Sequence, residues 1–183
     1  MNSVNFINFI KPLTELQPMQ KPLIITLKLE DKAKLYFNEL REEHFPAHIN
    51  FLEAHLTLFH ALPPREAIVQ NTLEQFSKRG FIELSITGLE KIGNGVVYTV
   101  ASDELQALHA GMQDAFRSFL VGKDKQKLWP HITIQNKVTA FKAQSLFEKL
   151  SIGFTPYNIK AIGFSTFLYN DGPWLHLQDY LFE

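Results

Sequence analysis

The clearest pattern along the chain is an alternation of polar and apolar residues that occurs twice. Residues 55–58 read His-Leu-Thr-Leu, and residues 131–134 read His-Ile-Thr-Ile. Alternation at every second position is typical of a β-strand that buries one face in a core. The imidazole and the hydroxyl of each segment therefore point together, away from the core. Two such strands lying side by side would place two imidazoles and two hydroxyls around one groove.

The remaining hydrophobic pattern predicts further helices and strands. Apolar residues spaced three and four apart indicate helices, and short runs rich in branched residues indicate strands. Helices are expected over about 31–44, 64–78, 103–119 and 140–150, and further strands over 23–29, 81–92, 95–101, 158–169 and 174–182. The glycine-rich turn at residues 93–95 favours a hairpin between two of these strands. Residues 1–20 contain apolar residues without a clean period, which predicts a short helix or an extended arm.

The order of these elements forms a weak internal repeat. A helix, a His-x-Thr strand, a second helix and a hairpin follow one another in each half of the chain. We therefore expect an α+β fold in which two related lobes, each with one His-x-Thr strand, meet at a central groove. The length of 183 residues and the lack of low-complexity linkers predict a single domain spanning residues 1–183.

Composition narrows the classes of function. The net charge is −1, which argues against a protein that grips long nucleic acid by bulk charge, although one phosphate in a local site remains compatible with it. The chain has no cysteine, so disulfides, thiolate metal sites and cysteine nucleophiles are excluded. Residues 1–20 lack the order of a secretory signal, and no run of about 18 apolar residues predicts a membrane span. We expect a cytoplasmic protein.

Two histidines suit the cleavage of a phosphodiester. Histidine titrates nearest neutrality, so one of His55 and His131 can take a proton from the attacking oxygen while the other gives a proton to the leaving oxygen. The hydroxyls of Thr57 and Thr133 can donate hydrogen bonds to the phosphate oxygens as charge develops there. This scheme requires neither a metal nor a cofactor. The other histidines show no metal-ligand spacing, so no metal site is predicted.

The chain resembles the 2H phosphoesterase superfamily, and within it the bacterial 2'-5' RNA ligase (LigT-like) family. The similarity lies in both His-x-Thr segments and in their surroundings: residues 21–27, 55–63, 93–98, 129–137 and 169–174. This resemblance covers roughly residues 21–183 and implies two mostly antiparallel sheets with flanking helices, related by pseudo-twofold symmetry. It implies an enzyme that acts on 2',3'-cyclic phosphates or 2'-5'-linked RNA ends, and its partner would be such a nucleotide or RNA end.

The chain departs from this family at one position. Many members carry an arginine five residues after the second motif histidine, and this chain has Asn136 there. Lys137 is the nearest replacement, and Arg65 follows the first His-x-Thr strand. Either side chain can neutralise phosphate charge. We therefore assign Lys137 to phosphate binding beside the two threonines.

Side chains alternate between the two faces of a strand, and this alternation, here called strand parity, predicts further residues that face the groove. Phe59 continues the face of His55, and Gln135 continues the face of His131, so both are expected to contact substrate unless a bulge intervenes. His60 has the opposite parity and is expected to face the core or begin a loop. Trp174, beside a turn, is a candidate to stack on a nucleobase.

Three hypotheses remain open at this stage. The first is a monomeric, metal-independent phosphodiesterase, capable of reversible RNA ligation through the same groups. The second is an RNA-end or nucleotide-binding module with little turnover, suggested by Asn136 and the neutral charge. The third is an unrelated α+β domain in which the repeated motif is a coincidence. Nothing in the sequence decides which histidine is the base.

Overall fold

The computed structural model describes residues 21–183, so the short helix or arm expected over residues 1–20 lies outside the described residues. The elements are β1 (Leu23–Leu29), α1 (Asp31–His44), η1 (Ala47–Ile49), β2 (Leu56–Leu62), α2 (Ala67–Ser77), β3 (Ile82–Lys91), β4 (Val96–Ala101), α3 (Asp103–Ala115), η2 (Gly122–Lys125), β5 (His131–Gln135), α4 (Ala140–Ser151), β6 (Tyr157–Tyr169) and β7 (Trp174–Leu181). The predicted α+β class is confirmed. None of the helices in residues 21–183 has the length and hydropathy that crossing a membrane requires.

The seven strands form one antiparallel sheet, ordered β2-β1-β6-β3-β4-β5, with β7 also paired to β6. The expectation of two separate sheets is therefore wrong. The reason is the 13-residue strand β6, which belongs to both halves of the chain. Its first part pairs with β3 through residues 157–161, and its remainder pairs with β1 and with β7. A strand of this length fuses what the internal repeat suggested were two sheets.

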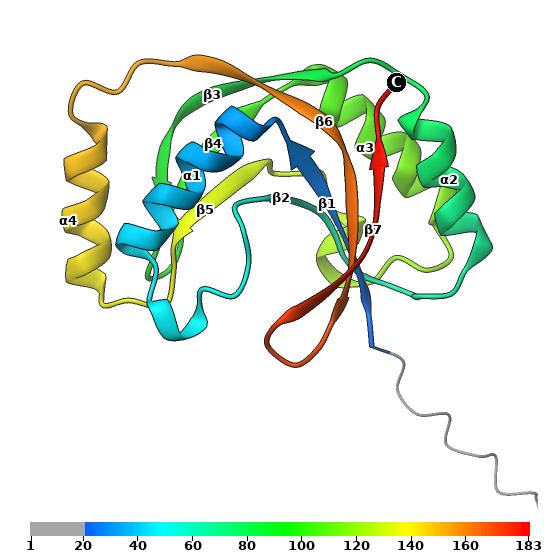
Figure 1. The fold of residues 1–183 in the computed structure, drawn as a ribbon, viewed down its shortest axis with the longest axis horizontal. Helices are drawn as coiled ribbons and strands as arrows, with labels where there is room; N and C mark the ends of the chain where they lie inside the picture. Colours follow the sequence, from blue (N-terminus) through cyan, green and yellow to red (C-terminus); the bar gives the residue numbers. More distant parts are fainter. Residues whose placement is uncertain (1–20) are drawn as a thin grey trace, which may run out of the picture.

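The sheet curls into a half-barrel, which brings its two edge strands together (Figure 1). β2 and β5 do not pair through their backbones, yet Cα atoms of the two strands come within 8 Å of one another. Since these edges are the two His-x-Thr strands, the curvature of the sheet positions both motifs in one region. The predicted side-by-side placement of these strands is therefore observed, although by a route that the sequence did not indicate.

The helices cover the sheet and complete one continuous hydrophobic core. α1 packs on β5, α3 packs on β3 and α2, and α4 packs on β3 and β4. Side chains of Ser102 and Thr139 accept hydrogen bonds from backbone N–H groups and cap α3 and α4. By contrast, Asp31 opens α1 without capping it.

Two predicted helix boundaries are wrong. α2 begins at Ala67 rather than near residue 64, because a turn follows the two prolines. α3 ends at Ala115 rather than near residue 119. The side chain of Phe116 is buried in line with the apolar face of α3, but its backbone lies in the turn that follows. The hydrophobic spacing therefore extends beyond the last helical residue and placed the predicted end too late.

Candidate active site

The two motif histidines occupy matching places at the start of the edge strands. His55 directly precedes β2, and His131 is the first residue of β5; both rings are half-buried. Thr57, from the first motif, lines a cavity of about 250 Å³ together with His131, from the second. The sheet therefore brings the two motifs to a common place, although not every predicted group lines the same cavity.

His55 lines a second cavity, of about 210 Å³, which also contains Trp174, Phe167, Thr26 and Ser165. Thr57, which lines the first cavity, follows His55 by two residues, about 7 Å along a strand. The predicted substrate contact Trp174 thus lies next to one motif histidine. The half-buried side chain of Thr133 lines neither cavity.

Both histidines are oriented by the same backbone contact. His55 Nδ1 lies 2.7 Å from the carbonyl oxygen of Glu53, and His131 Nδ1 lies 2.8 Å from that of Trp129. A carbonyl oxygen only accepts hydrogen bonds, so Nδ1 must carry the proton in each ring. Nε2 is therefore the ring nitrogen that is left to accept a proton when the ring is neutral and to donate one when it is charged.

A tryptophan packs against each histidine. The ring centroids of His55 and Trp174 are 5.0 Å apart, and those of His131 and Trp129 are 4.4 Å apart. Sequence reasoning did not single out Trp129, although its place directly before Pro130 and His131 was a signal. Each imidazole therefore has one aromatic neighbour that covers part of its surface.

Burial disfavours the charged form of both histidines. It lowers the pKa of His55 to about 4, and the charges of Arg41, His131 and His60 act in the same direction. Burial also lowers the pKa of His131, and the charges of His60 and Lys123 lower it further. Both rings are therefore neutral in the free protein at pH 7, and an anionic ligand would favour protonation of one of them.

A bulge in each motif strand overturns two of the predicted substrate contacts. In β2 the register shifts between Thr57 and Phe59, and in β5 it shifts between Thr133 and Gln135. The extra residue turns the next side chain into the core. Phe59 is 0% exposed and Gln135 is 5% exposed, so neither meets a ligand in the groove as predicted.

The side chain of Phe59 packs in the core, where it was predicted to contact substrate. Its ring stacks on His109, with centroids 4.7 Å apart, and packs edge-on against Phe116. His109 Nε2 lies 3.1 Å from the carbonyl oxygen of Leu58, to which it donates. Phe59 and His109 therefore fix the bulged part of β2 from the core side.

The same bulge reverses the expectation for His60. Its side chain is 54% exposed and lines the cavity that contains Thr57 and His131. His60 Nδ1 lies 3.1 Å from Asp124 Oδ1. Strand parity had directed this ring to the core, and the structure places it in the groove.

Arg41 is a second residue that sequence reasoning missed. Its guanidinium donates to the carbonyl oxygen of Thr133 at 2.8 Å, to that of Leu52 at 3.2 Å and to Asn50 Oδ1 at 2.7 Å. Burial lowers the pKa of Arg41 to about 10, which still leaves it charged at pH 7. This cation ties α1 to the loop before His55 and to the strand of His131.

Lys137 lies beyond the end of β5 at a left-handed backbone φ of 55°. Its side chain is exposed and lines neither cavity, so its assignment to phosphate stays a prediction. Within residues 21–183, no three histidine, aspartate or glutamate side chains are grouped so that they could hold a metal ion.

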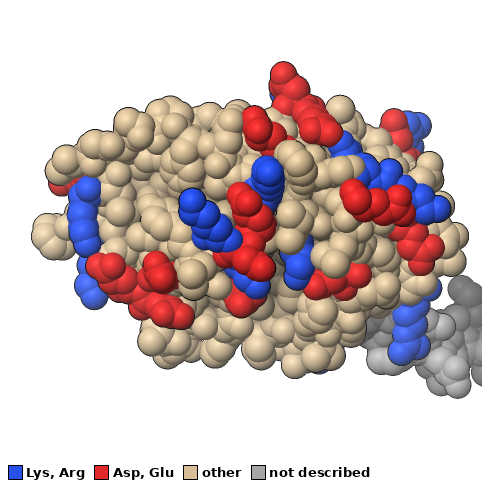
Figure 2. All heavy atoms as spheres, turned by 45° about the horizontal axis from the view of Figure 1, so that its top comes forward, with Lys and Arg blue, Asp and Glu red and all other residues tan. Residues whose placement is uncertain are grey.

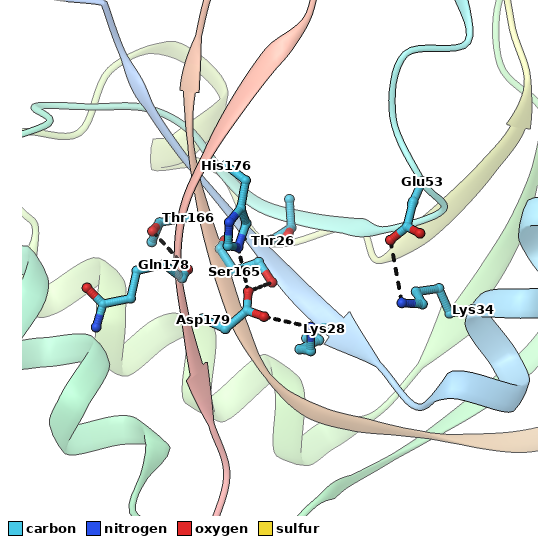
Figure 3. Close-up of polar contacts among 9 residues, drawn as sticks. All are labelled: Thr26, Lys28, Lys34, Glu53, Ser165, Thr166, His176, Gln178 and Asp179. Carbon is cyan, nitrogen blue, oxygen red and sulfur yellow. Dashed lines mark hydrogen bonds and ion pairs between the residues drawn. The ribbon is translucent and has the colours of Figure 1, made fainter.

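The carboxylate of Asp179 contacts Lys28 and Ser165, two of the residues that line the cavity of His55 (Figure 3). Asp179 accepts from Lys28 Nζ at 2.7 Å, from Ser165 Oγ at 2.6 Å and from His176 Nε2 at 2.8 Å. Burial alone would raise the pKa of Asp179, but these three donors hold it well below its usual range. Lys28 and Ser165, which line the cavity, are thereby fixed in place.

The protein is thus an α+β protein whose curled antiparallel sheet carries one His-x-Thr strand at each of two edges. Comparison of its sequence with models of known protein families identifies the family. The model of the 2'-5' RNA ligase superfamily matches residues 29–166. The chain belongs to this superfamily. No curated protein matches the chain.

Solved structures agree in fold. TT0787 of Thermus thermophilus superimposes with a TM-score of 0.56 at 14% identity, over 87% of this chain and 97% of that one. A phosphoesterase gives 0.53 at 15% identity, over 89% and 98%. LigT of E. coli, complexed with NADP+, gives 0.52 at 16% identity, over 89% and 98%. At such identities the likeness concerns the fold.

Proposed function

We propose that this protein is a metal-independent phosphodiesterase that opens 2',3'-cyclic phosphates or cleaves 2'-5'-linked RNA ends. The observation that carries the proposal is the matched orientation of His55 and His131. Each ring has Nδ1 committed to a backbone carbonyl oxygen and Nε2 left for proton transfer. Membership of the 2'-5' RNA ligase superfamily supports the same class of reaction.

In the proposed hydrolysis, one neutral imidazole takes a proton from water as the water oxygen bonds to phosphorus. The bond from phosphorus to the leaving ribose oxygen breaks, and the other imidazole, protonated when substrate binds, gives that oxygen its proton. The hydroxyls of Thr57 and Thr133 donate to the non-bridging oxygens, where negative charge grows. In ligation a ribose 5'-hydroxyl takes the place of water: one imidazole takes its proton as the oxygen bonds to phosphorus, the bond to the 3'-oxygen breaks, and the other imidazole protonates that oxygen. Cleavage of a 2'-5' linkage is the reverse of that step, with the two imidazoles exchanging roles.

The nucleoside is assigned to the cavity beside His55. This cavity combines the aromatic rings of Trp174 and Phe167, whose centroids are 5.7 Å apart, with the fixed polar groups Lys28 and Ser165. Aromatic rings bind any base by stacking, and polar groups orient it. Structures of E. coli LigT complexed with NADP+, 3'-AMP or ATP are consistent with a nucleotide ligand.

The charge of the surface favours a small ligand or an RNA end. On the face shown in Figure 2, basic and acidic side chains are interspersed without a broad area of one sign. The net charge is −1. Long nucleic acid is bound by continuous basic surfaces, so the local cavities must supply the affinity.

A direct assay tests this function. Wild type, His55→Ala and His131→Ala are incubated with nucleoside 2',3'-cyclic phosphates and with 2'-5' dinucleotides, and products are separated by chromatography. Each substitution should lower the rate by about 10²- to 10⁴-fold, since it removes one of two proton-transfer groups. His48→Ala is the matched control, because His48 is exposed on η1 and lines neither cavity. Wild type inactive on both panels, or a fully active His131→Ala, would falsify the proposal.

The second candidate is a nucleotide-binding module with little turnover. It is favoured by Asn136, whose side chain accepts from the backbone N–H of Lys137 at 2.7 Å and brings no positive charge. Tight binding of a nucleoside phosphate without product after long incubation would select this candidate over the enzyme.

A further inference from the structure

The cavity that contains Thr57 and His131 is also lined by a basic cluster that the proposed reaction does not use. This cluster consists of His60, Lys123 and Lys127. We propose that these three side chains form an anion subsite that takes a second phosphate group of the substrate, next to the phosphate that reacts. This inference rests on the proposed function and narrows its substrate class.

The first support is the way His60 is held. Asp124 is 3% exposed, and its carboxylate accepts from the backbone N–H of His60 at 2.9 and 3.0 Å and from that of Ala61 at 2.9 Å. The same carboxylate lies 3.1 Å from His60 Nδ1. Nδ1 is therefore committed to Asp124, and Nε2 on the far side of the exposed ring is the group that can meet a ligand.

The second support is the balance of charge. Lys123 and Lys127 are exposed, and within residues 21–183 no carboxylate lies within 4.0 Å of either ammonium group. Among the residues that line this cavity, Asp124 is the acidic one, and its hydrogen bonds to His60 and Ala61 occupy both oxygens. His109 contributes no charge to a ligand, because burial lowers its pKa and Nε2 donates to Leu58. The cluster is therefore cationic.

The third support is its position. The positive charges of His60 and Lys123 contribute, after burial, to the lowered pKa of His131, so the cluster lies within electrostatic range of that ring. An anion bound there would adjoin the reacting phosphate. His131 and the cluster share one cavity, whereas the proposed nucleoside site is the separate cavity lined by His55.

The fourth support is specific to this chain. His60 follows His55 by five residues, as Asn136 follows His131, and each strand has its bulge at the same point before that position. Asn136 brings no positive charge to its edge strand, and the equivalent place on the opposite edge strand holds the imidazole of His60.

The ligand class is a phosphate carried by the same nucleotide or oligonucleotide. It can be a 5'-phosphate on a cyclic mononucleotide or the internucleotide phosphate of an oligonucleotide that ends in a cyclic phosphate. Both present anionic oxygens to the ammonium groups of Lys123 and Lys127. Assays with one substrate of each kind distinguish a 5'-phosphate from an internucleotide phosphate as the ligand of this subsite.

The experiment compares kcat/KM for three substrates: a nucleoside 2',3'-cyclic phosphate, its 5'-phosphorylated form, and a dinucleotide ending in a 2',3'-cyclic phosphate. Wild type should prefer at least one of the two substrates that carry a second phosphate over the first by tenfold or more. Lys123→Ala and His60→Gln should each reduce this preference to about threefold or less. The control Lys125→Ala, from the same turn but outside the cavity, should keep the preference. Raised salt should weaken it, because exposed charges are screened.

A binding measurement separates this inference from the proposed function. By calorimetry, wild type should bind a nucleoside 3',5'-bisphosphate at least tenfold more tightly than the 3'-monophosphate, and Lys123→Ala should lose that difference. A protein inactive on every substrate but with this difference in affinity sinks the enzyme and keeps the subsite. A preference below twofold in both measurements, or an equal effect of Lys123→Ala and Lys125→Ala, overturns the subsite and leaves the enzyme standing.

Discussion

The guanidinium of Arg41 donates a 2.8 Å hydrogen bond to the backbone carbonyl oxygen of Thr133. This contact joins α1, in the first half of the chain, to the edge strand of the second. The same guanidinium holds the carbonyl oxygen of Leu52, three residues before His55. Within residues 21–183 no carboxylate lies within 4.0 Å of Arg41, so neutral oxygens surround this buried cation.

Replacing Arg41 by lysine should therefore harm both stability and the placement of the motifs. A lysine keeps the charge but cannot reach three acceptors in one plane, and each buried acceptor left unpaired costs about 1–3 kcal/mol. We expect a lower free energy of unfolding in urea and a reduced kcat on a cyclic substrate. Arg117→Lys, at an exposed position in the turn after α3, is the control and should leave both unchanged. Equal unfolding curves for Arg41→Lys and wild type would show that this contact is dispensable.

The pH dependence of catalysis should be displaced toward acid. The proposed reaction needs one neutral and one protonated imidazole, so kcat/KM should be bell-shaped. Burial lowers the pKa of His55 to about 4 and also lowers that of His131. The optimum of kcat/KM should therefore lie below pH 6.5, between the two values. A stopped assay across buffers of constant ionic strength checks this, and an optimum above pH 7 contradicts it.

His109 should make the fold sensitive to acid. Burial lowers its pKa in the folded protein, whereas the unfolded chain has an ordinary value of about 6.5. The unfolded state therefore binds more protons as the pH falls. The contribution of His109 is complete above about pH 6.5 and declines below it, down to the folded pKa. The slope of unfolding free energy against pH between 6.5 and 5 should be smaller in His109→Gln than in wild type.

The indole of Trp174 should contribute to nucleotide affinity. Stacking of a base on an aromatic ring is worth about 1–3 kcal/mol, so Trp174→Ala should raise KM for a cyclic nucleotide about 5- to 150-fold. Leu175→Ala, the next and exposed position on β7, is the matched control and should not change KM. If both variants behave alike, Trp174 serves the packing of His55 rather than the ligand.

The local sequence predicted the strands, the helices and the two motifs, because each depends on residues that are close in the chain. The bulges were not predictable, since a bulge exists only relative to a partner strand. That is why strand parity failed for Phe59, Gln135 and His60. The single sheet depends on β6 pairing with both halves, and Arg41 acts on carbonyl groups that no side-chain pattern marks. Such long-range relationships need the folded chain.

β6 is the strand that pairs with both halves of the described sheet, and the two motif-bearing edges share no backbone hydrogen bond. The distance between the imidazoles of His55 and His131 therefore depends on how strongly the strands between the two edges curve. The width of the proposed active site therefore depends on the curvature of the whole sheet, and a substitution far from both histidines that changes this curvature would also change that width.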